Sequence, residues 1–255
     1  MFYSVWPLWA SFDSTYTIES KDKFLIWDII FVNEDLFLVI DNKASWKEIH
    51  WEIKLYGNLF TPTTIFFQKF ISKYWYSWYF KFFKLYIPDI KYVLRYDLPL
   101  LKRHKFDLEW EYIFKYENFD KYCNYLKLWD DSIKCLDVKE FSPNLLSSKQ
   151  NLIVFPDDWS LFNFYEKYKI WEVLDINSTS LTRYKMFLKV KMGKVKTLIT
   201  THGGVFQDWK NLEKIFVFYP YKWYYKNQQN PRYYLPELSK QIKFFYNVND
   251  LYFLM

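Results

Sequence analysis

Lysines at regular spacing are the residues of this sequence whose type and placement point most directly to a chemistry. In the segment 63–87, Lys69, Lys73, Lys81 and Lys84 recur at helical spacing, which places their ammonium groups on one face of a helix. An ammonium group contacts phosphate as a point charge and does not read base identity. The stripe therefore predicts contact with a nucleic-acid backbone or with another anionic surface.

Two more groups of basic residues extend this prediction. One is the dense cluster that follows Leu100. The other lies in the segment 184–200, whose alternating pattern predicts a β-hairpin that turns at Met192-Gly193 and presents a flat basic patch. In these two groups, the residues expected to contact RNA backbone or another anionic surface are Lys102, Arg103, Lys105, Lys185, Lys189, Lys191, Lys194 and Lys196.

Two other interpretations of the lysine rows stay open. Lysine-rich faces are common, and an ordinary solvated face would need no partner. The predicted helix 63–87 also carries Trp, Phe and Tyr around its lysines, which is typical of a helix that lies in a membrane surface.

Other reactive side chains lack the spacing that catalysis or metal binding requires. His50, His104 and His202 are far apart, and Cys123 and Cys135 form no CxxC motif. We therefore expect no catalytic residue, no metal site and no cofactor, and we infer no small-molecule substrate. The sequence predicts a protein that is not an enzyme.

Two short polar motifs have a structural interpretation as well as a chemical one. The segment 201–204 (THGG) resembles a loop whose backbone N–H groups meet an anion, but it lacks the context of a phosphate-binding loop, so a turn is favoured. The pairs Asp130-Asp131 and Asp157-Asp158 lie near predicted helix ends, where capping is the usual role of a carboxylate.

The composition excludes several classes of protein. Hydrophobic residues make up 51% of the 255 residues, which is too many for a disordered chain. No run free of charged residues approaches the roughly 20 residues of a membrane-spanning helix. The N-terminal segment has neither a basic start before its apolar stretch nor the Arg and Ser richness of a transit peptide.

The skew of the composition points to the genome that encodes the chain. Residues with GC-rich codons are scarce, and arginine occurs only at Arg95, Arg103, Arg183 and Arg232. Phe, Tyr and Lys, which have AT-rich codons, are abundant, and 13 Trp fit a code in which UGA also encodes Trp. Stretches such as KYWYSWYFKFFKLY and YPYKWYYKNQQNPRYY resemble in texture the proteins encoded in ciliate mitochondrial genomes. This resemblance is one of composition, and it implies either a mitochondrial ribosomal subunit or a divergent subunit of a respiratory complex.

The pattern of the chain predicts an α+β fold with antiparallel hairpins or a meander, one long basic helix over 63–87 and two or three shorter helices. Strands are expected at 24–40, as a hairpin, and at 51–55, 106–114, 152–155, 215–219 and 242–246. Helices are also expected at 118–130 and from Asp157 or Asp158 to about Leu174. The loop 141–151 divides a predicted N-terminal region, 1–140, from a C-terminal region, 152–255, although one domain also fits.

Charge alternates along the chain in large blocks. Residues 1–60 carry a net charge of −4, 61–105 of +7, 106–181 of −6 and 182–255 of +9. Such blocks create oriented surface fields.

We expect a non-catalytic subunit of the mitochondrial ribosome that contacts rRNA through its lysines and neighbouring proteins through aromatic surface. The alternative is an accessory subunit of an inner-membrane respiratory complex or ATP synthase. In either case we expect the chain in the mitochondrial matrix, or on the matrix side of the inner membrane, within a large assembly.

Overall fold

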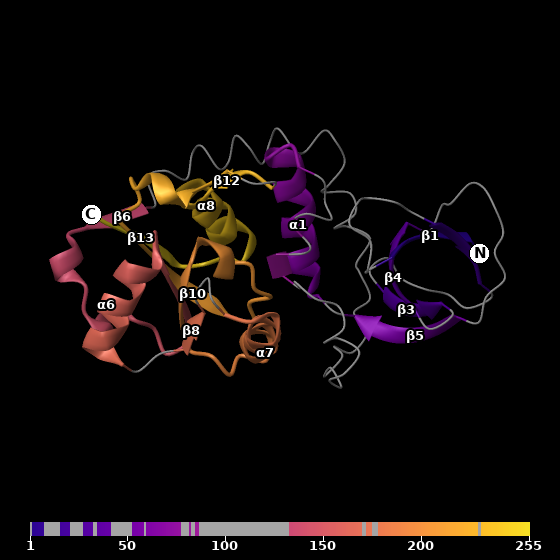
Figure 1. Ribbon diagram of the computed structural model, residues 1–255, viewed down its shortest axis with the longest axis horizontal. Helices are drawn as coiled ribbons and strands as arrows, with labels where there is room; N and C mark the ends of the chain where they lie inside the picture. Colours follow the sequence, from indigo (N-terminus) through magenta and orange to yellow (C-terminus); the bar gives the residue numbers. More distant parts are fainter. Residues whose placement is uncertain are drawn as a thin grey trace.

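The computed structural model of the chain describes residues 2–7, 16–20, 28–32, 35–41, 53–58, 60–77, 82, 85–86, 133–169, 172–174, 178–228 and 231–255. In these ranges the chain forms a five-stranded sheet, a six-stranded sheet, a two-stranded ribbon and four α-helices (Figure 1). The strands 106–114 and the helix 118–130 that the sequence predicts lie outside the described residues.

The N-terminal sheet is antiparallel, with the strand order β2-β1-β4-β3-β5. The hairpin predicted at 24–40 is confirmed, because β3 and β4 pair with Val32 opposite Asp35. The strand predicted at 51–55 is also present, although it pairs with β3 and not with its neighbour in sequence. The strands are β1 (Phe2–Pro7), β2 (Tyr16–Glu19), β3 (Asp28–Val32), β4 (Asp35–Asp41) and β5 (Ile53–Asn58).

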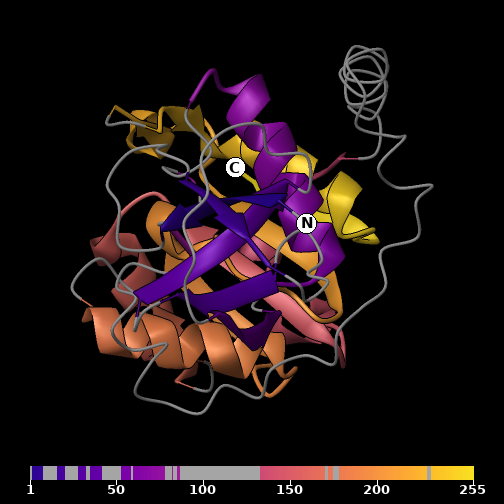
Figure 2. The ribbon, with the colours of Figure 1, turned by 90° about the vertical axis from the view of Figure 1, so that its right-hand side faces the viewer.

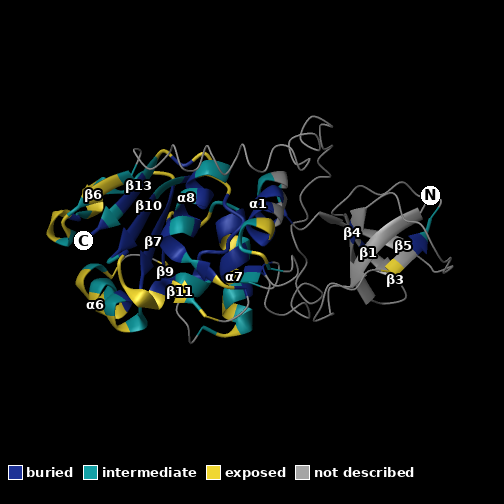
Figure 3. Ribbon diagram, turned by 90° about the horizontal axis from the view of Figure 1, so that it is seen from above, coloured by how far each residue is buried: buried dark blue, intermediate teal, exposed yellow. Residues whose placement is uncertain are grey.

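The larger sheet has six strands, and every neighbouring pair in it is parallel. Its order is β6-β13-β10-β7-β9-β8. The central strand β7 is buried along its whole length, as expected where helices cover both faces of a parallel sheet (Figure 3). The strands are β6 (Ile133–Leu136), β7 (Gln150–Phe155), β8 (Glu172–Leu174), β9 (Thr197–Thr201), β10 (Leu212–Phe218) and β13 (Asp250–Leu254).

Alternate residues of β7 divide the core into two layers, one on each face of this sheet. Leu152 and Val154 pack in one layer, which holds α1, α7 and α8, while Ile153 and Phe155 pack in the other, under α6. The period of two in a strand and the helices on both sides give a three-layer α/β arrangement. The helices are α1 (Pro62–Tyr74), α6 (Asp158–Tyr168), α7 (Ser180–Lys191) and α8 (Leu235–Phe245).

This arrangement corrects the predicted fold class. The antiparallel α+β fold with one long helix is wrong, because the main sheet is parallel and its helices are short. The loop predicted at 141–151 follows the 3-10 turn η2 (Val138–Glu140), contains the 3-10 turn η3 (Pro143–Leu145) and ends in β7. It connects β6 to β7 within the parallel sheet, so strands from both sides of this loop form one sheet.

The helix predicted over 63–87 ends much earlier, at Tyr74. Thr61 caps its start by accepting a hydrogen bond from the Thr64 backbone N–H, and Tyr76 follows its end with a left-handed φ of 49°. Figures 1 and 2 draw α1 beside α8, where Phe70 lies 4.9 Å from Phe245 between ring centroids.

The hairpin predicted at 184–200 is also wrong. Residues to Lys191 form α7, and Gly193 ends this helix with a φ of 73°. The segment Thr197–Thr201 is a separate strand, β9, that pairs with β7 and β8. The strand predicted at 242–246 lies mostly within α8, whereas the strand predicted at 215–219 is confirmed as part of β10.

The helix predicted from Asp157 or Asp158 is confirmed at its start. Asp157 caps α6 and accepts a 2.7 Å hydrogen bond from the Ser160 backbone N–H. The helix ends at Tyr168, where Lys169 turns left-handed, and not at Leu174. None of the helices that the structure describes has the length and apolar character needed to cross a bilayer.

Candidate nucleic-acid interface

The amino ends of the six parallel strands lie on one edge of the sheet. The loops that enter three adjacent strands there, β10, β7 and β9, carry exposed lysines. We call them the amino-edge lysines: Lys149, Lys194, Lys196 and Lys210. The sequence predicted two of them, Lys194 and Lys196, and missed the other two, which stand alone in sequence.

The buried side chain of Gln150 ties two of these loops together. Its amide nitrogen donates hydrogen bonds to the carbonyls of Val190 and Val195, at 2.9 and 3.1 Å. Its carbonyl oxygen accepts from the backbone N–H groups of Lys210 and Asn211, at 3.1 and 2.9 Å. The Val190 carbonyl also accepts the Gly193 backbone N–H, so Gln150 adds a second bond to that group and supplies a partner to three further loop groups. Its side chain thus helps to set the spacing of the loops.

Asn151 joins the third loop in the same way. Its side-chain nitrogen donates to the carbonyls of Ser147, Lys149 and Lys196, at 3.0, 3.1 and 3.2 Å. Its side-chain oxygen accepts from the Ser147 backbone N–H at 2.9 Å. Gln150 and Asn151 are both fully buried, and together they fix the backbone positions from which the amino-edge lysines project.

The amino-edge lysines have few acidic neighbours. Lys149 lies 3.5 Å from Glu213, a contact between exposed and half-buried groups. Lys194, Lys196 and Lys210 make no ion pair with any residue that the structure describes. Three cations on adjacent loops therefore face solvent without a counter-charge among those residues, which favours an external anion.

At the amino end of β13, which lies at the same edge of the sheet, the neighbouring lysines have an acidic partner. At the start of β13, Asp250 accepts from Lys134 at 2.6 Å and lies 3.9 Å from Lys214. Its pKa is lowered, because the hydrogen bond from Lys134 and the charges of both lysines outweigh the effect of burial. The amino-edge lysines without an ion pair to a described residue thus lie in the loops that enter β10 and β9.

Helix α7 carries two more of the predicted lysines next to this surface. Lys185 and Lys189 are exposed and lie one turn apart. Lys189 is 3.0 Å from Glu172, and its carbonyl accepts the backbone N–H of Lys194 at 2.9 Å. These residues extend the basic surface along α7, although they lie on a helix and not on the predicted hairpin.

Lys191, which the sequence placed in the same surface, is buried. Its ammonium nitrogen lies 3.3 Å from Asp208, and the two side chains are 5% and 0% exposed. Burial lowers the pKa of Lys191, and the charge and hydrogen bond of Asp208 oppose that shift. Lys191 is therefore a structural residue and does not reach a polyanion.

Other predicted contacts are only partly placed. Lys73 is exposed near the end of α1. Lys69 lies within α1, but its side chain is outside the described residues. Also outside them are Lys81, Lys84, Lys102, Arg103 and Lys105.

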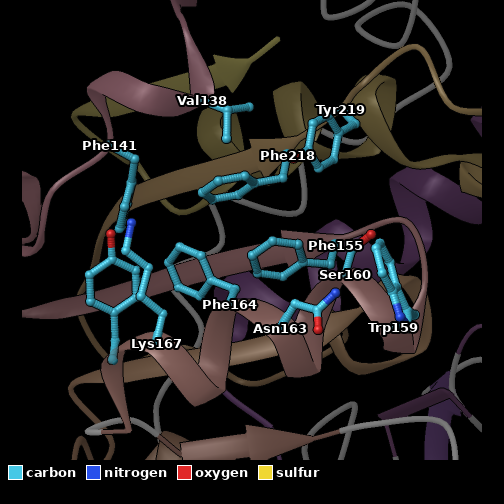
Figure 4. Close-up of a pocket in the computed structure, with 11 residues that line it drawn as sticks. Val138, Phe141, Phe155, Trp159, Ser160, Asn163, Phe164, Lys167, Phe218 and Tyr219 are labelled. Atoms are coloured by element: carbon cyan, nitrogen blue, oxygen red, sulfur yellow. The ribbon is translucent and has the colours of Figure 1, made fainter.

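The opposite, carboxyl edge of the sheet has a cavity of about 310 Å³. It lies where the chain leaves β7 and β10, whose following helices lead to opposite sides of the sheet. Ligands of open α/β sheets bind at such a point. Stacked rings of Phe155 and Phe218, 4.5 Å apart, line it, with Asn163 and Lys167 from α6 as polar groups (Figure 4).

His202 begins the 3-10 turn η4 (His202–Gly204) at the same carboxyl edge. Burial lowers its pKa, while the charge of Asp158 raises it and that of Arg183 lowers it. Gly204, at the end of this turn, packs closely against Thr200, and a Cβ added to Gly204 would lie 1.8 Å from Thr200 Oγ1. This packing agrees with a structural turn in the segment 201–204.

Groups of metal-ligating side chains do not occur among the residues that the structure describes. No protein-family model matches this chain, and no curated protein matches it either.

Proposed function

We propose that this chain is a non-catalytic structural subunit of the mitochondrial ribosome. In this proposal the amino-edge lysines contact rRNA backbone, and exposed rings such as Tyr16 and Trp159 contact neighbouring proteins. The composition of an AT-rich genome supports synthesis inside the organelle, and so a place in the matrix.

One observation carries the proposal: buried amides of Gln150 and Asn151 hold three lysine-bearing loops in fixed positions. Phosphates of a nucleic-acid backbone are spaced regularly, and lysines neutralise them without reading sequence. Cations with preset positions lose less freedom when they bind a polyanion.

The alternative, an accessory subunit of a respiratory complex or ATP synthase, places the predicted helix 63–87 on the membrane surface and buries aromatic surface against partner subunits. In α1 the apolar residues Phe67, Phe70 and Ile71 are buried in the protein core, against α8 among other elements. The apolar side chains of α1 that the structure describes as buried thus pack against protein and do not face lipid. This burial supports the ribosomal proposal over a membrane-surface role for α1.

The proposal is tested by sedimentation of a mitochondrial lysate with and without ribonuclease, followed by detection of the chain by mass spectrometry. We expect it to sediment with ribosomal particles and to shift to lighter fractions after digestion of the RNA. Migration with a respiratory complex, unchanged by ribonuclease, would overturn the proposal.

A further inference from the structure

A short loop at the carboxyl edge of the parallel sheet exposes aromatic rings next to cations. We call residues 219–228, which follow β10, the aromatic loop. Tyr221, Trp223 and Tyr224 are 64%, 59% and 45% exposed. Large aromatic side chains are rarely left this accessible in a cluster unless they contact something.

The loop is held rigidly from below by Tyr225. This side chain is fully buried, and its hydroxyl donates to the carbonyls of Val154 and Phe218, at 2.9 and 2.6 Å. The Tyr234 hydroxyl donates to the Pro220 carbonyl at 2.8 Å. The exposed rings therefore stand on a backbone that is anchored to the ends of two central strands.

The base of the loop is closed by a small antiparallel ribbon. Its strands are β11 (Lys226–Asn227) and β12 (Tyr233–Tyr234). Within the loop, the 3-10 turn η5 (Trp223–Tyr225) is closed by a hydrogen bond from the Tyr225 backbone N–H to the Lys222 carbonyl, at 3.2 Å. Both features limit the motion of the exposed rings.

Cations alternate with these rings. The sequence has no Asp or Glu between Tyr219 and Leu235, and the three basic residues Lys222, Lys226 and Arg232 are exposed. The Lys222 ammonium lies 5.9 Å from the centroid of the Tyr221 ring. Neighbouring rings of Trp223 and Tyr224 have centroids 4.1 Å apart with 34° between their planes.

A protein partner would be expected to meet a different surface. The cores of interfaces between proteins are depleted of lysine, whereas Lys222 and Lys226 stand exposed among these rings. In the described part of the chain, every exposed large hydrophobic residue except Met255 is aromatic, and none in the loop is aliphatic. Rings interleaved with cations and free of carboxylates are the pattern that binds single-stranded nucleic acid.

We propose that the aromatic loop stacks on unpaired bases of RNA, while Lys222 and Lys226 contact the adjoining phosphates. This inference rests on the proposed contact with RNA and names a second surface for it. A strand of five or six residues spans about 17–20 Å. Bases would thus be bound at the carboxyl edge, and backbone would be bound at the opposite end of the same strands.

The test measures the affinity of the purified full chain for a labelled oligouridylate of about ten nucleotides by fluorescence anisotropy. We expect the double variant Trp223→Ala/Tyr224→Ala to weaken binding about tenfold or more. Trp223→Phe keeps a ring and should retain most of the affinity. Tyr76→Asn is the matched control, because it removes a 98% exposed ring elsewhere at a left-handed position that asparagine tolerates.

A triple variant of the amino-edge lysines separates this inference from the proposed function. It carries the substitutions Lys194→Gln, Lys196→Gln and Lys210→Gln. If it weakens RNA binding while the double ring variant binds like the wild type, the stacking surface is wrong and the backbone contact stands. If wild type and variants all fail to bind RNA, both proposals fail. If the ring variant keeps its RNA affinity but loses a neighbouring protein in the particle, the loop is a protein contact and the inference is overturned.

Discussion

Lys191 and Asp208 form a buried ion pair that joins three helices of the parallel-sheet region. Lys191 ends α7, and Asp208 lies just before β10. The Asp208 carboxylate also accepts hydrogen bonds from the Thr61 backbone N–H, at 3.0 Å, and from the hydroxyls of Thr61 and Thr64 at the start of α1. Tyr246, at the end of α8, is 2.7 Å from the Thr64 hydroxyl. One carboxylate thus fixes the start of α1 against the end of α7.

Removing the cation of this pair should destabilise the fold strongly. In Lys191→Met the Asp208 carboxylate stays buried without its counter-charge, and we expect the free energy of unfolding to fall by about 3–5 kcal/mol. Urea unfolding followed by circular dichroism measures the loss. The matched control is Lys189→Met, because Lys189 and Glu172 are 47% and 46% exposed, and such pairs contribute about 1 kcal/mol or less. Equal losses in the two variants would contradict the structural role of Lys191.

The amino-edge lysines should determine how RNA binding depends on salt. Each lysine that contacts a phosphate contributes about one unit to the slope of log affinity against log salt concentration. We expect Lys194→Gln, Lys196→Gln and Lys210→Gln each to reduce that slope for a structured RNA, measured by filter binding. Lys139→Gln, an exposed lysine just after the carboxyl end of β6, should leave the slope unchanged. A slope that responds equally to Lys139→Gln would show that the amino-edge lysines are not specific phosphate contacts.

The positioning role of Gln150 predicts a loss of stability together with a loss of affinity. Gln150→Met keeps the length of the side chain but removes the hydrogen bonds to two carbonyls and two N–H groups, of which only the Val190 carbonyl keeps a bond, from the Gly193 backbone N–H. Each unsatisfied buried group costs about 1–3 kcal/mol, so we expect a loss of at least about 2 kcal/mol by urea unfolding and weaker RNA binding. The exposed Gln228 provides the control, since Gln228→Met should change stability by less than about 0.5 kcal/mol. A loss of stability with unchanged RNA affinity would show that Gln150 stabilises the fold but does not position the lysines for RNA.

Local signals in the sequence identified some elements correctly. The strand β7 was predicted at 152–155 because an apolar run there stands between turn residues, and Asp157 was predicted as a cap because a carboxylate before a helical pattern is a local signal. Helix α7 was missed because alternation of Lys185 and Lys189 around Phe187 fits a strand as well as a helix. Its buried residues recur at three-residue intervals, which is the spacing that the strand interpretation overlooked.

The parallel sheet and its site could not be read from local patterns. β6 pairs with β13, whose residues lie at the other end of the described C-terminal region, and no turn signal joins them. Lys149 and Lys210 join Lys194 and Lys196 only because three strands are adjacent in the sheet. Gln150 and Asn151 fell in the predicted loop 141–151, although they begin β7. Two polar residues at the start of an apolar run are a usable signal for side chains that bind backbone groups.

His202 should make stability depend on pH near neutrality. Its folded pKa lies below the ordinary value of 6.5 because it is partly buried. As the pH falls below 6.5, the imidazole of His202 takes up a proton more readily in the unfolded chain than in the folded chain. The contribution of His202 to the free energy of unfolding is therefore complete above about pH 6.5 and decreases as the pH falls below it. Comparing the unfolding free energy of wild type and His202→Gln between about pH 5 and pH 7 isolates this contribution. A constant difference between them across this range would show that His202 does not titrate differently in the two states.

The glycines of the turn η4 provide a paired test of the packing at the carboxyl edge. A Cβ at Gly204 would lie 1.8 Å from Thr200 Oγ1 and 2.9 Å from Thr200 Cβ, within a buried strand end. A Cβ at Gly203 would have Arg183 Nη1 as its nearest neighbour, at 3.9 Å, which is ordinary contact. We expect Gly204→Ala to destabilise by about 1–3 kcal/mol through overpacking and Gly203→Ala to change stability by less than about 1 kcal/mol, by thermal unfolding. The Thr200 side chain cannot move aside without losing the 2.6 Å hydrogen bond that its hydroxyl donates to the Leu174 carbonyl. A Gly204→Ala variant as stable as the wild type would therefore mean that the end of β9 is packed more loosely than these distances require.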